Sequence, residues 1–256
     1  MGISPEKGTV IPVILGHRGA PKVAPQNTLS SFKMALEMGA DGVELDVRLT
    51  KDRKFVIIHD PMVDNVTNGK GYVGDYTLVE LKRLDAGSWF SKEFQNERIP
   101  TLEEALDILR SFKIVNIEIK NDPIPCEGIE EIFLEFIFNT EIRNRVIVSS
   151  FDHSLLLRLK RLDDSINTGV LYSCKPENPN LLAIDVKANS LHPFWPSIGE
   201  DTVRDAHNVG LKIFPWTVDE ESYMRILLEW NVDGIITNSP ELALKVRSEI
   251  SSSKDV

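Results

Sequence analysis

Three acidic residues lie at spacings that place them on one face of two β-strands. In the run DGVELDVR, Glu44 and Asp46 alternate with apolar residues, and in the run VNIEIK, Glu118 does the same. Successive side chains of a strand point to opposite faces, so each run has one apolar and one charged face. Carboxylate oxygens are preferred ligands of hard divalent cations. We therefore expect Glu44, Asp46 and Glu118 to bind one divalent ion, magnesium or calcium, with manganese as a third candidate.

The same charged faces carry Arg48 and Lys120, which leaves a second interpretation open. Either cation could neutralise a neighbouring carboxylate as an ion pair, without any metal. For a single carboxylate the two interpretations have about equal weight. Three carboxylates on strands that lie close together favour the metal, because buried like charges are costly unless a strong positive charge compensates them.

Histidines provide groups that can move protons. Of the five histidines, three end apolar runs: His17 after VIPVILG, His59 after FVII and His192 after VKANSL. Imidazole gives and takes protons near neutral pH, so His17 and His59 are the candidate general acid and base. Arg18 follows His17 directly, and its planar guanidinium matches a phosphate group. With Lys120, these residues predict phosphoryl chemistry in which the metal and the two cations stabilise negative charge.

Eight strand-like runs alternate with helix-like runs along the chain and would have to position these residues. The runs begin at Val10, Asp41, Val115, Arg145, Asn167, Val186, Leu211 and Val232. Eight parallel strands close a barrel, and the carboxyl ends of barrel strands form the active site. Capping boxes that begin at Thr77 and Thr101 mark helix starts. We predict an α/β fold, a (β/α)8 TIM barrel, as a single domain over residues 1–256, with apolar strand faces outward and the carboxylates inward.

One stretch interrupts the alternation. From about residue 60 to residue 98 the chain is polar and irregular, with asparagine and glycine in turn-like positions. A loop of this length is unusual in a compact domain unless it is functional. We interpret residues 60–98 as a small subdomain inserted after the second strand, with one short helix at 78–84.

The overall composition excludes several classes of function. The formal net charge is −10, whereas a nucleic-acid-binding surface needs a basic patch, so no nucleic-acid partner is expected. The N-terminal residues MGISPEKGTV lack the basic and apolar parts of a signal peptide, and no run is long enough to span a membrane. Cys126 and Cys174 have no metal-ligand spacing and are expected to be free thiols. We expect a cytoplasmic protein without stable membrane anchoring.

The chain resembles the glycerophosphodiester phosphodiesterase family. The matching segments follow one another over nearly the whole sequence: GHRGA at 16–20, PQNT at 25–28, GADGVELDVRLTKD at 39–52, VIIHDPMVDNVTNGKG at 56–71, RIPTLEEAL at 98–106, IEIK at 117–120, SSF at 149–151, AHNVGLKIFPWTV at 206–218 and DGIITNSP at 233–240. The HRG motif alone is weak evidence, but this order and spacing of motifs is very specific.

The resemblance implies metal-dependent hydrolysis of a glycerophosphodiester to an alcohol and sn-glycerol 3-phosphate. It also implies where a small extra subdomain lies, at residues 60–98 near the barrel mouth. The implied roles are metal ligands at Glu44, Asp46 and Glu118, an acid–base pair at His17 and His59, phosphate contacts from Arg18 and Lys120, and a glycerol or leaving-group contact from Trp216. Supporting positions behind these residues are expected for Gln26, Asn27, Phe151 and His192.

Two positions depart from the family pattern. Gln26 stands where the family usually has a glutamate, so it can still hydrogen bond but removes a charge, which could loosen Arg18 or change metal affinity. Asp219 stands where the family often has asparagine, and we expect it to cap the following helix equally well.

Three other functions are compatible with parts of the sequence. A lysophospholipase D would need an apolar entrance or a membrane-binding segment, and none is evident. A catalytically silent binding barrel would be favoured by the loss of a histidine or a metal ligand, but all of them are present. A sugar-phosphate isomerase would leave the histidines and carboxylates without a shared task.

In the phosphodiesterase itself, either water or the glycerol 2-hydroxyl serves as the nucleophile. Attack by the glycerol 2-hydroxyl would give a cyclic intermediate.

Overall fold

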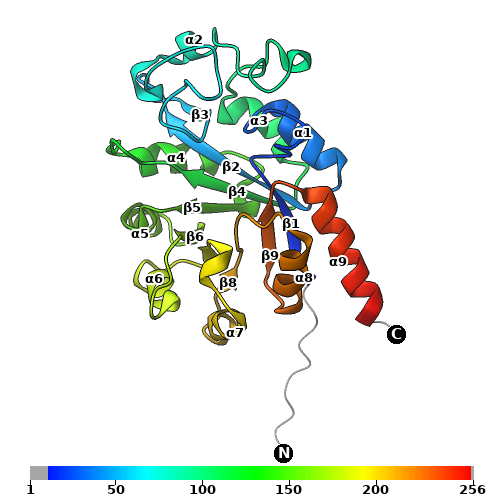
Figure 1. The fold of residues 1–256 in the computed structure, drawn as a ribbon. Coiled ribbons are helices and arrows are strands. Elements are labelled where there is room, and N and C mark those ends of the chain that lie inside the picture. Colours follow the sequence, from blue (N-terminus) through cyan, green and yellow to red (C-terminus); the bar gives the residue numbers. More distant parts are fainter. Residues whose placement is uncertain (1–10, 255–256) are drawn as a thin grey trace, which may run out of the picture.

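The fold is a (β/α)8 barrel (Figure 1). The computed structural model describes residues 11–254; the segment MGISPEKGTV, on which the expected lack of a signal peptide rests, lies outside them. Within the described residues the parallel strands are β1 (Val13–His17), β2 (Gly42–Leu49), β4 (Ile114–Ile119), β5 (Val146–Ser150), β6 (Asn167–Tyr172), β7 (Ser190–Pro193), β8 (Lys212–Ile213) and β9 (Gly234–Thr237).

The strands pair in the order β8-β7-β6-β5-β4-β2-β1-β9, and each of these pairs is parallel. At the two ends of this order, the N–H groups of Asp233 and Ile236 donate to the carbonyls of Ile213 and Pro215. These two bonds bring β8 and β9 together, so the sheet curves back on itself.

Helices follow the parallel strands and form the outer layer of the barrel (Figure 1). Thr28 caps the first of them, and Thr101 forms the predicted capping box with Glu104. A second predicted capping box, at Thr77, is also present. The outer helices are α1 (Leu29–Glu37), α3 (Leu102–Leu109), α4 (Ile129–Phe138), α5 (His153–Leu162), α6 (Pro179–Asp185), α7 (Glu200–Asn208), α8 (Glu221–Glu229) and α9 (Pro240–Lys254), with short 3₁₀ turns η3 (Arg143–Arg145) and η4 (Trp195–Ser197) between elements.

Apolar side chains fill two separate regions of the barrel. The large cluster between strands and helices takes the apolar faces of β2 and β4, including Val43, Leu45 and Ile117. A smaller cluster around Leu15, Phe214 and Ile236 includes side chains from the lower part of the barrel interior. The apolar faces of β2 and β4 therefore point outward, as predicted. Their acidic faces point into the barrel, above this inner cluster.

An additional strand lies beside β2. Strand β3 (Phe55–Ile57) pairs antiparallel with the end of β2, after a turn in which Arg53 adopts a φ of 57°. The sequence indicated the apolar run FVII before His59, but the eight predicted strands did not include it, and its pairing with β2 was not predicted. The polar stretch at 60–98 therefore follows β3 and not β2 directly.

Residues 60–98 contain η1 (Val73–Asp75), α2 (Leu78–Leu81) and η2 (Lys92–Phe94), which lie together at one edge of the barrel (Figure 1). The helix is thus shorter than the predicted 78–84. A separate buried cluster includes Val63, Val73 and Leu81. Such a cluster gives the stretch a small core of its own, and its interpretation as an inserted subdomain stays a prediction.

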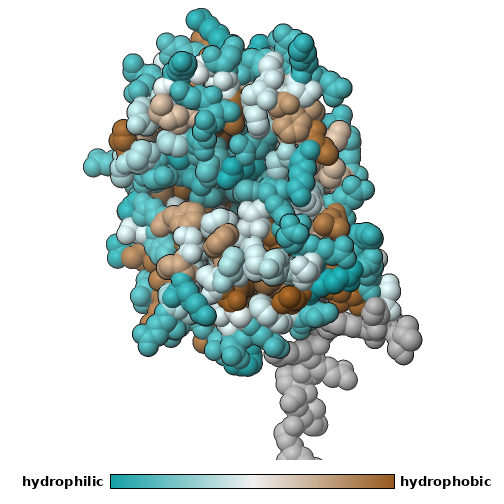
Figure 2. Space-filling model, in the orientation of Figure 1, coloured by the Kyte–Doolittle hydropathy of each residue, from teal (hydrophilic) through white to brown (hydrophobic). Residues whose placement is uncertain are grey.

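Hydrophilic residues cover most of the face seen in Figure 2, and hydrophobic residues form scattered spots on it. Cys126 and Cys174 are free thiols, as predicted. Among the helices that the structure describes, none combines the length with the apolar character that a bilayer crossing requires.

Candidate functional site

Three buried carboxylates converge inside the barrel. Strands β2 and β4 pair in a register that sets Asp46 beside Glu118, while Glu44 lies beside Asn116. One carboxylate oxygen from each of Glu44, Asp46 and Glu118 lies within 4.8 Å of the other two. Hard oxygen donors at this spacing suit a single divalent cation, so the structure brings together the three residues that the sequence predicted as ligands.

Two side-chain cations lie against this acidic cluster. The Lys120 ammonium is 2.5 Å from Glu118 Oε1 and 3.3 Å from Asp46 Oδ1, and Arg18 Nε is 3.2 Å from Asp46 Oδ2. Glu44 has no lysine or arginine partner among the described residues; it accepts a hydrogen bond from the Arg18 backbone N–H at 3.0 Å. Two cations do not balance three carboxylates, so the ion pairs leave a cluster that could still hold a metal ion.

The pKa values of the cluster show the same shortage of positive charge. Burial, together with the neighbouring Asp46 carboxylate, raises the pKa of Glu118 to about 7. Burial and the other two carboxylates also raise the pKa of Glu44 well above its usual range. Burial opposes ionisation of Asp46, but Lys120 and Arg18 outweigh it and lower the Asp46 pKa. Asp46 Oδ1 is buried and receives no hydrogen bond, although Lys120 Nζ lies 3.3 Å away, so this oxygen remains available to a bound cation.

Arg48 does not take part in the cluster. Its guanidinium donates to the carbonyls of His59 and Asp122, and it makes no ion pair with the three carboxylates. The interpretation of Arg48 as their counter-ion is wrong, because at the end of β2 its long side chain reaches the loops beyond the strands.

His17 is held by a chain of two polar side chains. Its Nδ1 lies 2.8 Å from Asn238 Oδ1, and Asn238 Nδ2 donates to Asp219 Oδ2 at 2.7 Å. A carboxylate only accepts, so the Asn238 amide must turn its oxygen to His17, and Nδ1 must carry the proton. The other nitrogen, Nε2, faces Glu44 at 3.9 Å. Burial, followed by the Arg18 charge, lowers the pKa of His17 to about 4.

His59 is held differently, by a carboxylate. Its Nδ1 lies 2.7 Å from Asp60 Oδ1, and Asp60 also accepts a hydrogen bond from Asn65. The same reasoning places a proton on Nδ1 and leaves Nε2 without one when the ring is neutral. Burial lowers the pKa of His59, while the Asp46 and Asp60 carboxylates oppose that effect.

The segment after β1 positions the phosphate-binding candidate Arg18. Arg18 and Gly19 have φ values of 54° and 93°, and a Cβ at Gly19 would collide with Ser31. This tight turn holds Arg18 beside Asp46. Gln26 accepts from Arg18 Nη1 at 2.7 Å, so the amide at this position still holds the guanidinium. Asn27 donates to Asp46 Oδ2 at 2.8 Å.

Aromatic residues line the other side of the cavity. Phe151 and Trp216 meet edge to face at 5.7 Å, and Phe194 lies 5.5 Å from Trp216. His192 is fully buried beneath them; its carbonyl accepts from Trp216 Nε1, and its ring contacts Ser190 and Phe214. The cavity measures about 80 Å³ and is lined by His17, Arg18, Glu44, His59, Asn116, Glu118, Lys120, Phe151, Leu171, Trp216 and Ile236.

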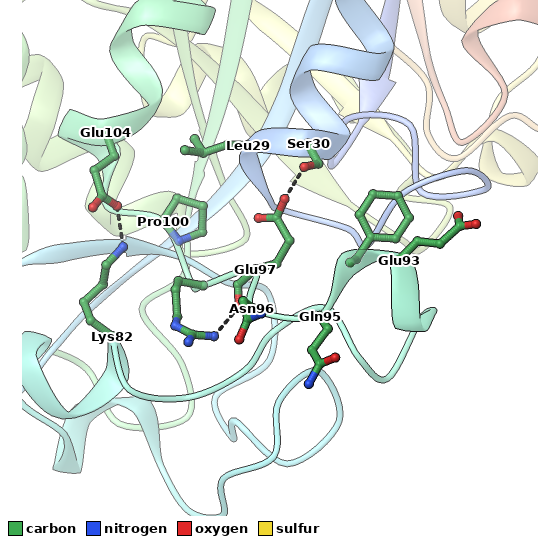
Figure 3. Close-up of a pocket in the computed structure, with 11 residues that line it drawn as sticks. Leu29, Ser30, Lys82, Glu93, Gln95, Asn96, Glu97, Pro100 and Glu104 are labelled. Atoms are coloured by element: carbon green, nitrogen blue, oxygen red, sulfur yellow. Dashed lines mark hydrogen bonds and ion pairs between the residues drawn. The ribbon is translucent and has the colours of Figure 1, made fainter.

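A larger hollow of about 510 Å³ lies outside the barrel, between residues 93–98 and the first turns of α1 and α3 (Figure 3). Several of its charged groups have partners within it: Lys82 pairs with Glu104, and Glu97 accepts from Ser30 (Figure 3). The hollow shares no lining residue with the barrel cavity.

The sequence did not identify the partners of the two histidines. Asp219 was expected to cap the next helix, but Glu220 is the N-cap of α8 and Asp219 faces Asn238 instead. Asp60 adjoins His59 in the motif HD, and this adjacency was the available signal. Asn116, inward on β4, was also missed; its Oδ1 is buried without a hydrogen-bond partner.

Comparisons with known proteins agree on one family. The model of the glycerophosphoryl diester phosphodiesterase family matches residues 17–242. A protein of Caldanaerobacter subterraneus subsp. tengcongensis named glycerophosphodiester phosphodiesterase is 44% identical, over 91% of this chain and 97% of the relative. One of the same name from Bacillus altitudinis is 40% identical, over 93% and 98%.

A solved structure shows the same relationship. The Oleispira antarctica phosphodiesterase, in complex with the product sn-glycerol-3-phosphate, superimposes with a TM-score of 0.84 at 32% identity, covering 94% of this chain and 97% of its own. This chain is a hydrolase that belongs to the glycerophosphoryl diester phosphodiesterase family.

Proposed function

We propose that the protein hydrolyses glycerophosphodiesters to an alcohol and sn-glycerol 3-phosphate, with one divalent ion held by Glu44, Asp46 and Glu118. The observation that carries this is the meeting of three buried carboxylates, two histidines and two cations around one cavity. A bound magnesium or calcium ion would polarise the phosphate and offset its charge. Arg18 and Lys120 bind phosphate oxygens, and Trp216 contacts the glycerol or the leaving alcohol.

The two histidines divide the proton transfers according to their partners. The carboxylate of Asp60 stabilises a protonated His59, which suits the general acid that protonates the leaving oxygen. The neutral amide of Asn238 does not stabilise a protonated His17 in this way. The low pKa of His17 keeps its Nε2 free to take a proton from the nucleophile.

The test is a coupled assay of glycerol 3-phosphate release from glycerophosphocholine and glycerophosphoethanolamine, with and without a chelator. We expect release that the chelator abolishes and that added magnesium or calcium restores. Glu44→Gln should remove both activity and its metal dependence, since Gln keeps the size and an acceptor for the Arg18 N–H. Chelator-resistant release by the wild-type protein would refute the metal-dependent mechanism.

A lysolipid substrate forms a further arm of this assay. Phe151 lines the cavity and is 47% exposed, and Phe194, 38% exposed, contacts Trp216 of the cavity lining, which gives this side an aromatic character. We expect the small diesters to be preferred, because the cavity measures only about 80 Å³. Faster turnover of the lysolipid would reassign the enzyme as a lysophospholipase D.

A further inference from the structure

Arg48 is a buried cation to which the proposed reaction gives no task. It follows Asp46 on the inward face of β2 and is 7% exposed. Its Nε donates to the His59 carbonyl at 2.8 Å, its Nη1 donates to the Asp122 carbonyl, and its Nη2 lies 3.4 Å from Asp122 Oδ1. The guanidinium thus joins the segment that carries His59 to the loop that follows Lys120.

Arg48 contacts both segments directly after their last hydrogen bonds to the sheet. The N–H of Ile58 donates to the Asp46 carbonyl, and the N–H of Lys120 donates to the Val47 carbonyl. His59 comes one residue after the first of these bonds. Its neighbour Asp60 orients the imidazole ring, but Asp60 belongs to the same segment and cannot fix that segment relative to the barrel. Arg48 supplies an attachment from β2 to the His59 backbone itself.

The geometry of the bonds requires an arginine. Its planar fork offers several donors in fixed directions and serves both carbonyls at once, which a lysine ammonium on a flexible stem does not do in the same way. As a device for stability alone the arrangement is poor, because Arg48 is buried while its carboxylate partner Asp122 has a side chain that is 73% exposed. Buried ionic groups of this kind contribute little net stability compared with apolar residues.

We infer that Arg48 is a positioning residue for His59. By fixing the His59 carbonyl against the loop after Lys120, it holds the imidazole at the distance that proton transfer to the leaving oxygen needs. The inference rests on the proposed function. A displacement of about 1 Å in such a group costs up to about 100-fold in rate.

The test is a double-mutant cycle between Arg48→Met and His59→Ala, with kcat and KM measured by glycerol 3-phosphate release. Arg48→Met should lower kcat by about 10- to 100-fold with little change in KM, because the phosphate contacts remain. In the His59→Ala background the same change should cost almost nothing further, because its effect passes through the missing imidazole. Arg48→Lys should recover part of the loss.

The matched control is Arg247→Met. Arg247 is also partly buried and donates to a carbonyl, that of Pro12, and to the Asp41 carboxylate, at the opposite end of the strands. It should lose stability and keep its kcat. Amide hydrogen exchange gives a readout without substrate: segments 58–63 and 121–126 should exchange faster in Arg48→Met and be unchanged in the control.

Equal losses of kcat from Arg48→Met in both backgrounds, or a rise in KM alone, would overturn the inference. So would unchanged exchange in the two segments. A wild-type protein that releases no glycerol 3-phosphate would refute the proposed function instead, and the exchange measurement would still decide whether Arg48 tethers the His59 segment. If Arg48→Met does not fold, Arg48→Gln takes its place in the cycle.

Discussion

Removal of one carboxylate from the acidic cluster should stabilise the metal-free protein. In the folded protein the pKa of Glu118 is about 7, against an ordinary value of 4.5. The folded state therefore binds the proton more tightly than the unfolded state, and stability falls as the pH rises from about 4.5 through 7. At about 1.4 kcal/mol per pH unit, the ionised side chain costs up to about 3 kcal/mol above pH 7. Glu118→Gln removes that cost.

The assay is urea unfolding followed by fluorescence, at pH 5 and pH 8, in chelator and in excess magnesium. In chelator, the stability of Glu118→Gln relative to wild type should rise by up to about 3 kcal/mol between the two pH values. At a metal concentration 100 times the dissociation constant, wild type should gain about 2.7 kcal/mol, and the variant much less because it lacks a ligand.

Glu130→Gln is the control for this experiment. Glu130 is 5% exposed and pairs with Arg158 outside the barrel interior. Its change should give no gain at pH 8, and the variant should keep the wild-type gain in magnesium because its acidic cluster is intact. If Glu118→Gln instead loses stability in chelator at pH 8, the bond from Lys120 outweighs burial and repulsion, and the proposed shortage of positive charge is wrong.

Three further changes test the site. His17→Ala and His59→Ala should each lower turnover by about 10²–10⁴-fold. On a nitrophenyl diester, whose leaving group needs no proton, the turnover of His59→Ala should recover and that of His17→Ala should not. The reverse pattern would exchange the roles of the two histidines. Asn238→Ala should lower kcat more than KM, because it frees the His17 ring, and an unchanged kcat would contradict this. Metal affinity, measured by calorimetry, should fall about tenfold per pH unit below pH 7, because Glu118 must then release a proton, and more steeply where Glu44 is protonated as well. Affinity independent of pH would refute the raised pKa values.

The acidic face could be predicted from the sequence because strand periodicity is local. Alternation of apolar and acidic residues around Glu44 and Glu118 depends only on neighbouring residues, and the rule that strand ends gather in a barrel then brings distant motifs together. The same rule accounts for His17. The antiparallel pairing of β3 could not be predicted, because the short run FVII carries no period and its pairing depends on the turn before it.

The partners of the histidines depend on contacts that no local pattern encodes. Asn238 reaches His17 across 221 positions of the chain, through the pairing of β1 with β9. Asp219 could cap a helix or face Asn238, and only the closed barrel decides between these. For Arg48 the strand pattern gave the correct face, but the length of its side chain carried it past the carboxylates to the loops.

The apolar cluster of Leu15, Phe214 and Ile236 gives the cavity a floor. Substrate and products must therefore use one opening, and the order in which they leave becomes part of the kinetics. In the proposed reaction the alcohol, freed from the phosphate, would depart first, and glycerol 3-phosphate would keep the contacts proposed for Arg18 and Lys120 until it exits by the same route. Retained product occupies the position of the next substrate, so inhibition by glycerol 3-phosphate should be competitive, and the cell's own pool of it would set the pace of turnover.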